Sequence, residues 1–308
     1  MTMTESHSCS LRTSCSVVFF MSVIVFLYLD FMTVPKMDHI RISDGLPPVR
    51  IAHCFVGGAR TLYLPETYQL YAKQVLHPIQ AQHDIFMVMD LEQGLKGAKT
   101  IQMNRTHYDR ALAYLKPIRV VWVEDAPPFS GEFDPSDFYY KWSVCAKLFE
   151  TVELLNGTRY DYVIKTRPDL IVLRELPPMN KWPQDKVWIN PYYEYAGDIP
   201  EELELTTELF RTTSTNGYSD PNEMPISDIF GIVPRKYASI YFNVVRNDEH
   251  ICRRFCGNRE GMLECRLKTS LGLANVSYEI APVVVKIRRS FQNCESFSNS
   301  VGLFNSLC

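Results

Sequence analysis

Short apolar runs and amphipathic stretches follow each other along most of this chain. Residues 49–56 form an apolar run that ends at Gly57 and Gly58, a pattern typical of a buried strand leading into a turn. Similar runs predict strands at residues 83–89, 118–123, 160–164, 187–190, 226–233 and 283–287. Helical spacing of apolar residues predicts helices at residues 65–76, 106–115, 136–155, 234–242 and 264–273. Strands that alternate with helices indicate an α/β fold, with a mostly parallel, Rossmann-like sheet and helices on both faces.

The ends of the predicted strands carry the polar residues that suggest chemistry. In open parallel sheets, ligands bind beyond the carboxyl ends of the strands. This rule places six residues on one edge of the sheet: Gly57, Gly58, Arg60, Asp90, Arg167 and Asp169.

A second kind of apolar segment lies near the start of the chain. Residues 17–29 carry no charge, and residues 17–32 approach the lower limit of about 17 residues for a spanning helix. A cleaved signal peptide is the alternative, but no small-x-small cleavage site follows the segment. We therefore expect a cytosolic tail at residues 1–16, a transmembrane signal anchor at 17–32, a stem at 33–48 and a luminal domain at 49–308.

Glycosylation sequons and cysteines bear on the compartment of that domain. Three Asn-x-Ser/Thr sequons follow the apolar segment, at Asn104, Asn156 and Asn275. Seven of the nine cysteines also follow it, and in an oxidising lumen they are expected to form disulfides. We expect a single-pass type II membrane protein of the secretory pathway, with the Golgi as its compartment.

The late cysteines admit another interpretation. A zinc site is the alternative for a group of four potential ligands, although it lacks the usual C-x-x-C spacing: His250, Cys252, Cys256 and Cys265. Cys9 and Cys15 precede the apolar segment and are either palmitoylation sites or free thiols.

Charge and missing motifs exclude several classes of function. The chain has 32 basic and 35 acidic residues, so no strongly basic surface is implied and nucleic acid is not an expected partner. The sequence also has no Gly-x-Ser-x-Gly elbow, Walker loop or His-Glu-x-x-His motif. Serine hydrolases, P-loop enzymes and zincins therefore lack their usual signals.

The most informative segment is the end of the predicted strand at 160–164, which continues as Lys165-Thr166-Arg167-Pro168-Asp169. A carboxylate at Asp169 is suited to a divalent cation that neutralises a nucleotide diphosphate. Arg167 offers a planar fork of donors suited to phosphate or to a carboxylate. The alternative is an Arg–Asp pair that only stabilises the strand end.

These segments resemble a known family. The stretches YDYVIKTRPDL, ISDIFGIVPRKYASIYF, IAHCFVGGARTL and HDIFMVMD are similar to glycosyltransferase-like proteins with an Arg-Pro-Asp strand end. Those proteins are in turn similar to the WavE-type lipopolysaccharide and capsule glycosyltransferases. The resemblance covers roughly residues 49–287.

The resemblance implies a GT-A fold and a nucleotide-sugar donor, usually with manganese or magnesium. Where the GT-A metal motif is usually Asp-x-Asp, this chain has Arg167-Pro168-Asp169, so Asp169 alone maps onto a metal-binding carboxylate. Metal-assisted binding through one carboxylate, and metal-free binding by Arg and Lys, both remain open. The turn with Gly57, Gly58 and Arg60 maps onto the first nucleotide-contacting loop, with Asp90 on the same edge.

The resemblance also suggests which residue handles the acceptor. Asp228 matches an acidic position beside the acceptor and is the predicted catalytic base, with Glu264 in reserve. An N-cap or a solvated strand edge is the structural alternative for Asp228.

Taken together, the sequence predicts a glycosyltransferase that uses a nucleotide-sugar donor and a glycan, protein or lipid acceptor. Two alternatives stay open. One is a catalytically inactive relative that binds glycans or partner enzymes. The other is a glycoside hydrolase that uses two carboxylates, such as Asp169 and Asp228.

Overall fold

A computed structural model describes residues 49–91, 103–125, 138–179, 182–191, 226–244, 263–281 and 285–287. The predicted tail, anchor and stem lie outside these residues, as do Cys9, Cys15, His250, Cys252 and Cys256. Among the helices that the structure describes, none is long and apolar enough to cross a bilayer. The membrane anchor therefore stays a prediction.

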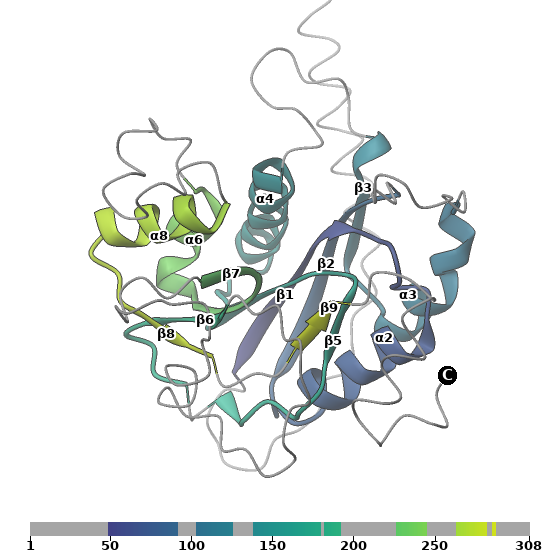
Figure 1. The fold of residues 1–308 in the computed structure, drawn as a ribbon, viewed down its shortest axis with the longest axis horizontal. Helices are drawn as coiled ribbons and strands as arrows, with labels where there is room; N and C mark the ends of the chain where they lie inside the picture. Colours follow the sequence, from purple (N-terminus) through teal and green to yellow (C-terminus); the bar gives the residue numbers. More distant parts are fainter. Residues whose placement is uncertain are drawn as a thin grey trace, which may run out of the picture. The chain divides into compact units, whose positions relative to one another are not determined.

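The described part is built around a seven-stranded sheet with the strand order β3-β2-β1-β4-β7-β6-β8 (Figure 1). Its strands are β1 (Arg50–Gly58), β2 (Gln82–Asp90), β3 (Arg119–Trp122), β4 (Tyr162–Thr166), β6 (Val187–Pro191), β7 (Ile226–Pro234) and β8 (Tyr278–Ile280). All neighbouring pairs are parallel except those of β7, which runs antiparallel to both β4 and β6. A separate pair joins β5 (Leu170–Val172) to β9 (Val285–Ile287). The predicted strand at 283–287 thus belongs to this small sheet and not to the main one.

Helices connect the parallel strands and cover both faces of the sheet. They are α2 (Pro65–Tyr71) with a π-helical continuation η1 (Ala72–Leu76), α3 (Asp109–Leu115) after the 3-10 turn η2 (Arg105–Tyr108), α4 (Phe138–Asn156), α6 (Ala238–Phe242) after η6 (Arg235–Tyr237), and α8 (Leu263–Leu273). Another 3-10 turn, η3 (Val123–Asp125), follows β3. In Figure 1, α2 and α3 lie on one side of the sheet, and α4, α6 and α8 lie on the other.

The alternation of side chains along β1 explains which helix packs on which face. Phe55 points to the α2 face, where its ring centroid lies 4.6 Å from that of Tyr71. Cys54, one residue earlier, points to the opposite face and forms a disulfide with Cys145 of α4. Neighbouring residues in a strand face opposite sides of the sheet, so each face of this buried strand has its own helical cover. The structure confirms the predicted α/β sheet with helices on both faces.

Candidate functional site

The turn after β1 brings backbone and side chains close to the end of β2. Gly57 has a φ of +133°, which glycine adopts without strain, and Arg60 has a φ of +35°, which is unusual for a residue with a side chain. The Ala59 N–H donates a 2.8 Å hydrogen bond to the Asp90 carbonyl. A Cβ at Gly58 would lie 3.3 Å from the Asp90 carboxylate, so the backbone passes close to that side chain. A strained backbone at Arg60 is typical of residues held in place for function.

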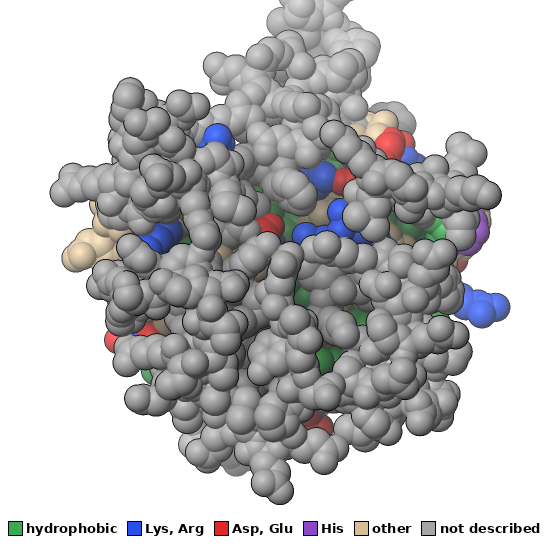
Figure 2. Space-filling model, in the orientation of Figure 1, with side chains coloured by type: hydrophobic (Ala, Val, Ile, Leu, Met, Phe, Trp, Pro, Cys, Tyr) green, Lys and Arg blue, Asp and Glu red, His purple; other side chains and the backbone are tan. Residues whose placement is uncertain are grey.

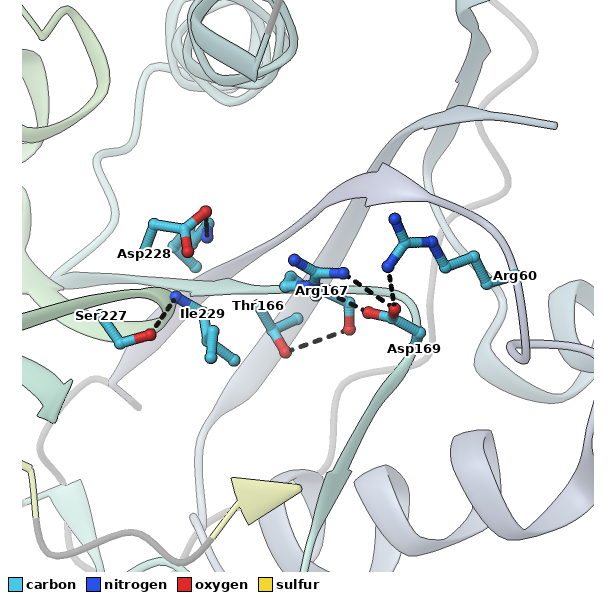
Figure 3. A network of polar contacts seen from close by, with 8 residues as sticks. Arg60, Thr166, Arg167, Asp169, Ser227, Asp228 and Ile229 are labelled. Carbon is cyan, nitrogen blue, oxygen red and sulfur yellow. Dashed lines mark hydrogen bonds and ion pairs between the residues drawn. The ribbon is translucent and has the colours of Figure 1, made fainter. Parts of the chain in front are cut away.

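The turn after β4 is centred on an ion cluster that joins Arg60, Arg167 and Asp169 (Figure 3). Arg167 donates from Nε to Oδ1 and from Nη2 to Oδ2 of Asp169, each at 2.8 Å. Arg60 donates from Nη1 to the same Oδ2 at 2.9 Å, across 109 residues of sequence. Asp169 is fully buried, whereas the side chain of Arg60 is 26% exposed. The carboxylate is therefore held by guanidinium groups on both of its oxygens.

Burial and charge act in opposite directions on these groups. Burial alone would raise the pKa of Asp169, but the hydrogen bonds and charges of Arg167 and Arg60 hold that pKa below its ordinary value. Burial would also lower the pKa of Arg167, but Asp169, Asp228 and Asp90 together raise it. All three carboxylates therefore act on the same guanidinium, and Asp169 is ionised in the folded chain.

Asp228 lies on β7, and in Figure 3 Arg167 lies between it and Asp169. Its carboxylate is 4.0 Å from the ammonium of Lys165, and its side chain is 14% exposed. Lys165 is buried on β4, and its Nζ lies 4.6 Å from the centroid of the Trp142 ring. Trp142 in turn stacks on Tyr241, with the ring planes 3° apart. The buried Lys165 ammonium thus lies near both the Trp142 ring and the Asp228 carboxylate.

A further ion pair lies at the same edge of the sheet. Lys141 of α4 is buried and bonds to the carboxylate of Asp90, at the end of β2. Figure 2 shows Lys and Arg side chains, with acidic ones among them, near the centre of this face, over the end of β1. We call the set of seven charged side chains the rim cluster; its members are Arg60, Asp90, Lys141, Lys165, Arg167, Asp169 and Asp228.

The structure brings together nearly all of the residues that the sequence singled out. Gly57, Gly58 and Asp90 line the turn that carries Arg60, and Arg167 with Asp169 lies against it. A Cβ at Gly57 would lie 3.7 Å from the ring of Pro168, so the two turns touch. Glu264 lies in the first turn of α8, and its side chain is outside the described part, so its role stays a prediction.

Sequence reasoning missed Lys141, Lys165, Trp142 and Tyr241 as parts of this site. Lys165 could have been found from the sequence, because it is a charged residue within an apolar strand, Tyr162–Thr166. The structure buries every residue of that strand. A buried lysine needs a compensating charge, so its partner should have been sought. Lys141 could not have been found in this way, because lysine is common on helices.

The described residues do not fit a divalent cation at Asp169. Both of its oxygens accept hydrogen bonds from arginine, and two guanidinium groups would repel a cation there. Within the described ranges, no group of three or more His, Cys, Asp or Glu side chains is placed to hold a metal ion.

Disulfides are present in the described part. Cys54 and Cys145 are bonded across 91 residues, and both are completely buried. Cys265 is disulfide-bonded too, and a thiol in a disulfide is not a zinc ligand. The zinc alternative therefore loses one of its four predicted ligands.

Comparisons with known proteins do not identify a family for this chain. No family model matches the sequence, and a search among curated proteins finds no match. Similar solved structures include the galactosyltransferase LgtC in complex with donor and acceptor sugar analogs, at 11% identity and a TM-score of 0.33 over 75% of this chain and 73% of that chain. An active-site mutant of LgtC is similar at the same identity and TM-score, over 75% of this chain and 72% of that chain. Because both values are low, the functional inference rests on the residues of the rim cluster.

Proposed function

We propose that this protein is a glycosyltransferase of GT-A type, which transfers a sugar from a nucleotide-sugar donor to a glycan, protein or lipid acceptor. One observation carries the proposal: Arg60 and Arg167 lie together on Asp169, at the carboxyl ends of β1 and β4. Asp228 lies beside them. Ligands of open α/β sheets bind at this edge. The family resemblance of the Arg-Pro-Asp segment gives the ligand class.

Two guanidinium groups suit the diphosphate of such a donor. Arginine presents planar, paired donors that match phosphate oxygens, and its charge is permanent. When the sugar leaves, negative charge grows on the diphosphate, and fixed cations at that point lower the barrier. Arg60 and Arg167 have this role in the proposal, and the turn at Gly57 and Gly58 lets backbone N–H groups approach the same phosphates.

Asp228 is the proposed catalytic base. An acceptor hydroxyl has to lose a proton as it attacks the sugar, and a carboxylate within hydrogen-bond reach can take it. The Asp228 side chain is 14% exposed, whereas Asp169 is fully buried and bonded to two arginines. Asp228 is therefore the carboxylate of this pair that an acceptor can reach.

The burial and the arginine partners of Asp169 also weigh against a two-carboxylate glycoside hydrolase. Such an enzyme needs one carboxyl that is protonated and can donate. The pKa of Asp169 is lowered and its oxygens are hydrogen-bonded, so it is unsuited to be a general acid. A binding-only relative stays as the second candidate, because the guanidinium-bound Asp169 departs from the usual metal motif of active GT-A enzymes.

We also propose that the domain is luminal, in a type II membrane protein of the Golgi. The asparagines of all three sequons are exposed, as acceptors of glycans must be: Asn104, Asn156 and Asn275. Expression in eukaryotic cells should therefore give a protein whose mass falls in steps on endoglycosidase treatment. An unchanged mass would refute the luminal placement.

The proposed activity is tested with the full-length chain, purified from eukaryotic cells in a mild detergent. A panel of nucleotide sugars is offered with a mixture of glycan acceptors, and nucleotide release is measured. We expect release from one donor, with a loss of at least about a hundredfold in Asp228→Asn, because general-base catalysis contributes about that much. Binding of a nucleotide without release in any acceptor mixture supports the binding-only relative, and no binding at all refutes both.

The matched control is Arg235→Gln. Arg235 forms the same kind of two-bond fork, with Glu153, at 2.8 and 2.7 Å, and its side chain is 11% exposed against 12% for Arg167. It lies next to Asp161, at the opposite end of β4 from Arg167. Arg167→Gln should abolish release while Arg235→Gln retains it. An equal loss of nucleotide release in both variants would mean that the Arg167–Asp169 hydrogen bonds only stabilise the fold.

A further inference from the structure

The hydrogen bonds of Asp169 leave a cation no good place to bind. Three donors reach its two oxygens: Nε and Nη2 of Arg167 at 2.8 Å each, and Nη1 of Arg60 at 2.9 Å. A divalent cation held by Asp169 would need one of these two oxygens as a direct ligand, at about 2.0–2.6 Å. It would have to displace charge-assisted hydrogen bonds, which are among the strongest in proteins.

Exposure shows which groups face a ligand. Asp169 is 0% exposed, the Arg167 side chain is 12% exposed and the Arg60 side chain is 26% exposed. At this turn, a ligand that arrives from solvent therefore meets the two guanidinium groups before it meets the carboxylate of Asp169. Among the described residues, Arg60 uses only Nη1 on Asp169 and retains its other nitrogen donors, and Arg167 retains Nη1.

The charge of the rim cluster points to the same kind of ligand. Four of its side chains are cationic (Arg60, Lys141, Lys165 and Arg167) and three are carboxylates (Asp90, Asp169 and Asp228), which gives a net charge of +1 for these seven described residues. The carboxylates already have cationic partners, so the surplus lies on the arginines. An anion is attracted to such a cluster, and a divalent cation is repelled.

We propose that the site binds the diphosphate of its donor without a divalent cation, with Arg60 and Arg167 supplying the positive charge. Asp169 is then a positioning residue: its hydrogen bonds hold the two guanidinium groups in place, and it does not touch the ligand. The ligand class rests on the proposed function, whereas the independence from metal rests on the hydrogen bonds and burial of the described residues.

The experiment measures binding, and the probes are uridine diphosphate, guanosine diphosphate and cytidine diphosphate. Each is titrated by calorimetry into the full-length chain in detergent, once with excess chelator and once with millimolar Mg²⁺ or Mn²⁺. We expect one of the three to bind in chelator, with a Kd that changes less than about threefold when metal is added. In chelator, Arg167→Gln should weaken this binding about tenfold or more, as expected for the loss of a charged hydrogen bond. Arg235→Gln should leave it unchanged.

Asp169→Asn separates the positioning role from a metal-binding role. An amide oxygen carries no charge and is a weaker ligand for a divalent cation than a carboxylate, but it still accepts a hydrogen bond from arginine. We expect Asp169→Asn to weaken binding by a few fold, equally in chelator and in metal. A Kd that is tight only with metal, together with loss of that metal effect in Asp169→Asn, would overturn the proposal and leave the proposed function standing. If none of the three nucleotides binds under any condition, the proposed function fails with it.

Discussion

Replacing Asp169 by asparagine removes the negative charge that two guanidinium groups share and leaves the size of the side chain almost unchanged. The side chain keeps its shape, so no cavity is created. The hydrogen bonds that Arg167 and Arg60 donate lose their ionic partner, and the new amide N–H₂ group points donors at donors. The substitution therefore tests the ion cluster and not the packing.

The expected magnitude follows from burial. Breaking a buried ion pair costs about 3–5 kcal/mol, because a charge is left without a partner. Arg60 is partly exposed and can turn to water, so the loss should lie near the lower end, about 3 kcal/mol. For a domain of this size, that corresponds to a fall in the melting temperature of about 6–12 °C.

The melting temperature is followed by tryptophan fluorescence at neutral pH, with Asp125→Asn as control. Asp125 is paired with Arg105 at 2.6 Å, but its side chain is 61% exposed, so its removal should shift the midpoint by much less than that of Asp169. The pKa of Asp169 is lowered in the fold, so its stabilisation is present above its ordinary pKa of about 3.9 and is lost as the pH falls below that value. The difference between wild type and Asp169→Asn should therefore shrink below about pH 4. A midpoint for Asp169→Asn within about 2 °C of wild type would refute the reasoning.

Three further experiments test other parts of the fold. Replacing Cys54 and Cys145 by alanine should lower the stability by about 2–5 kcal/mol, seen as a lower melting temperature, because the bond closes a loop of 91 residues. In Gly231→Ala the new Cβ would lie 2.5 Å from the hydroxyl of Tyr241, so unfolding should become easier by about 1–3 kcal/mol, and less so in a Tyr241→Phe background. Burial lowers the pKa of His83 and, further, that of its hydrogen-bonded partner His53, so the melting temperature should fall as the pH drops below about 6.5, with a shallower slope in His83→Gln.

The elements of the main sheet were largely predictable because their patterns are local. The apolar runs that became β1, β2, β3, β4 and β7 are 4 to 9 residues long, and the helices between them have amphipathic spacing. The direction of β7 was not predictable, because side-chain alternation is the same in parallel and antiparallel strands. Strands β5 and β8 have three residues each, too few to give a period.

The site was predictable only in part, for a similar reason. The rule that ligands bind at the carboxyl ends of strands placed Arg60 and Asp169 on one edge, but the ion pair between them spans 109 residues and depends on the shape of both turns. The sequence therefore suggested Asp169 as a metal ligand, whereas the structure surrounds it with arginine. Lys165 and Trp142 meet only because α4 packs over β1, the neighbour of β4 in the sheet, which no local pattern encodes.

A crystal structure of the chain with the nucleoside diphosphate that stabilises it would test the central claim most directly. The account predicts diphosphate oxygens within about 3.2 Å of the guanidinium groups of Arg60 and Arg167. The terminal phosphate, which carries the transferred sugar in the donor, should lie on the side of Asp228. A diphosphate bound away from these two arginines would contradict the proposed site. A diphosphate held through a cation on Asp169 would contradict its metal independence.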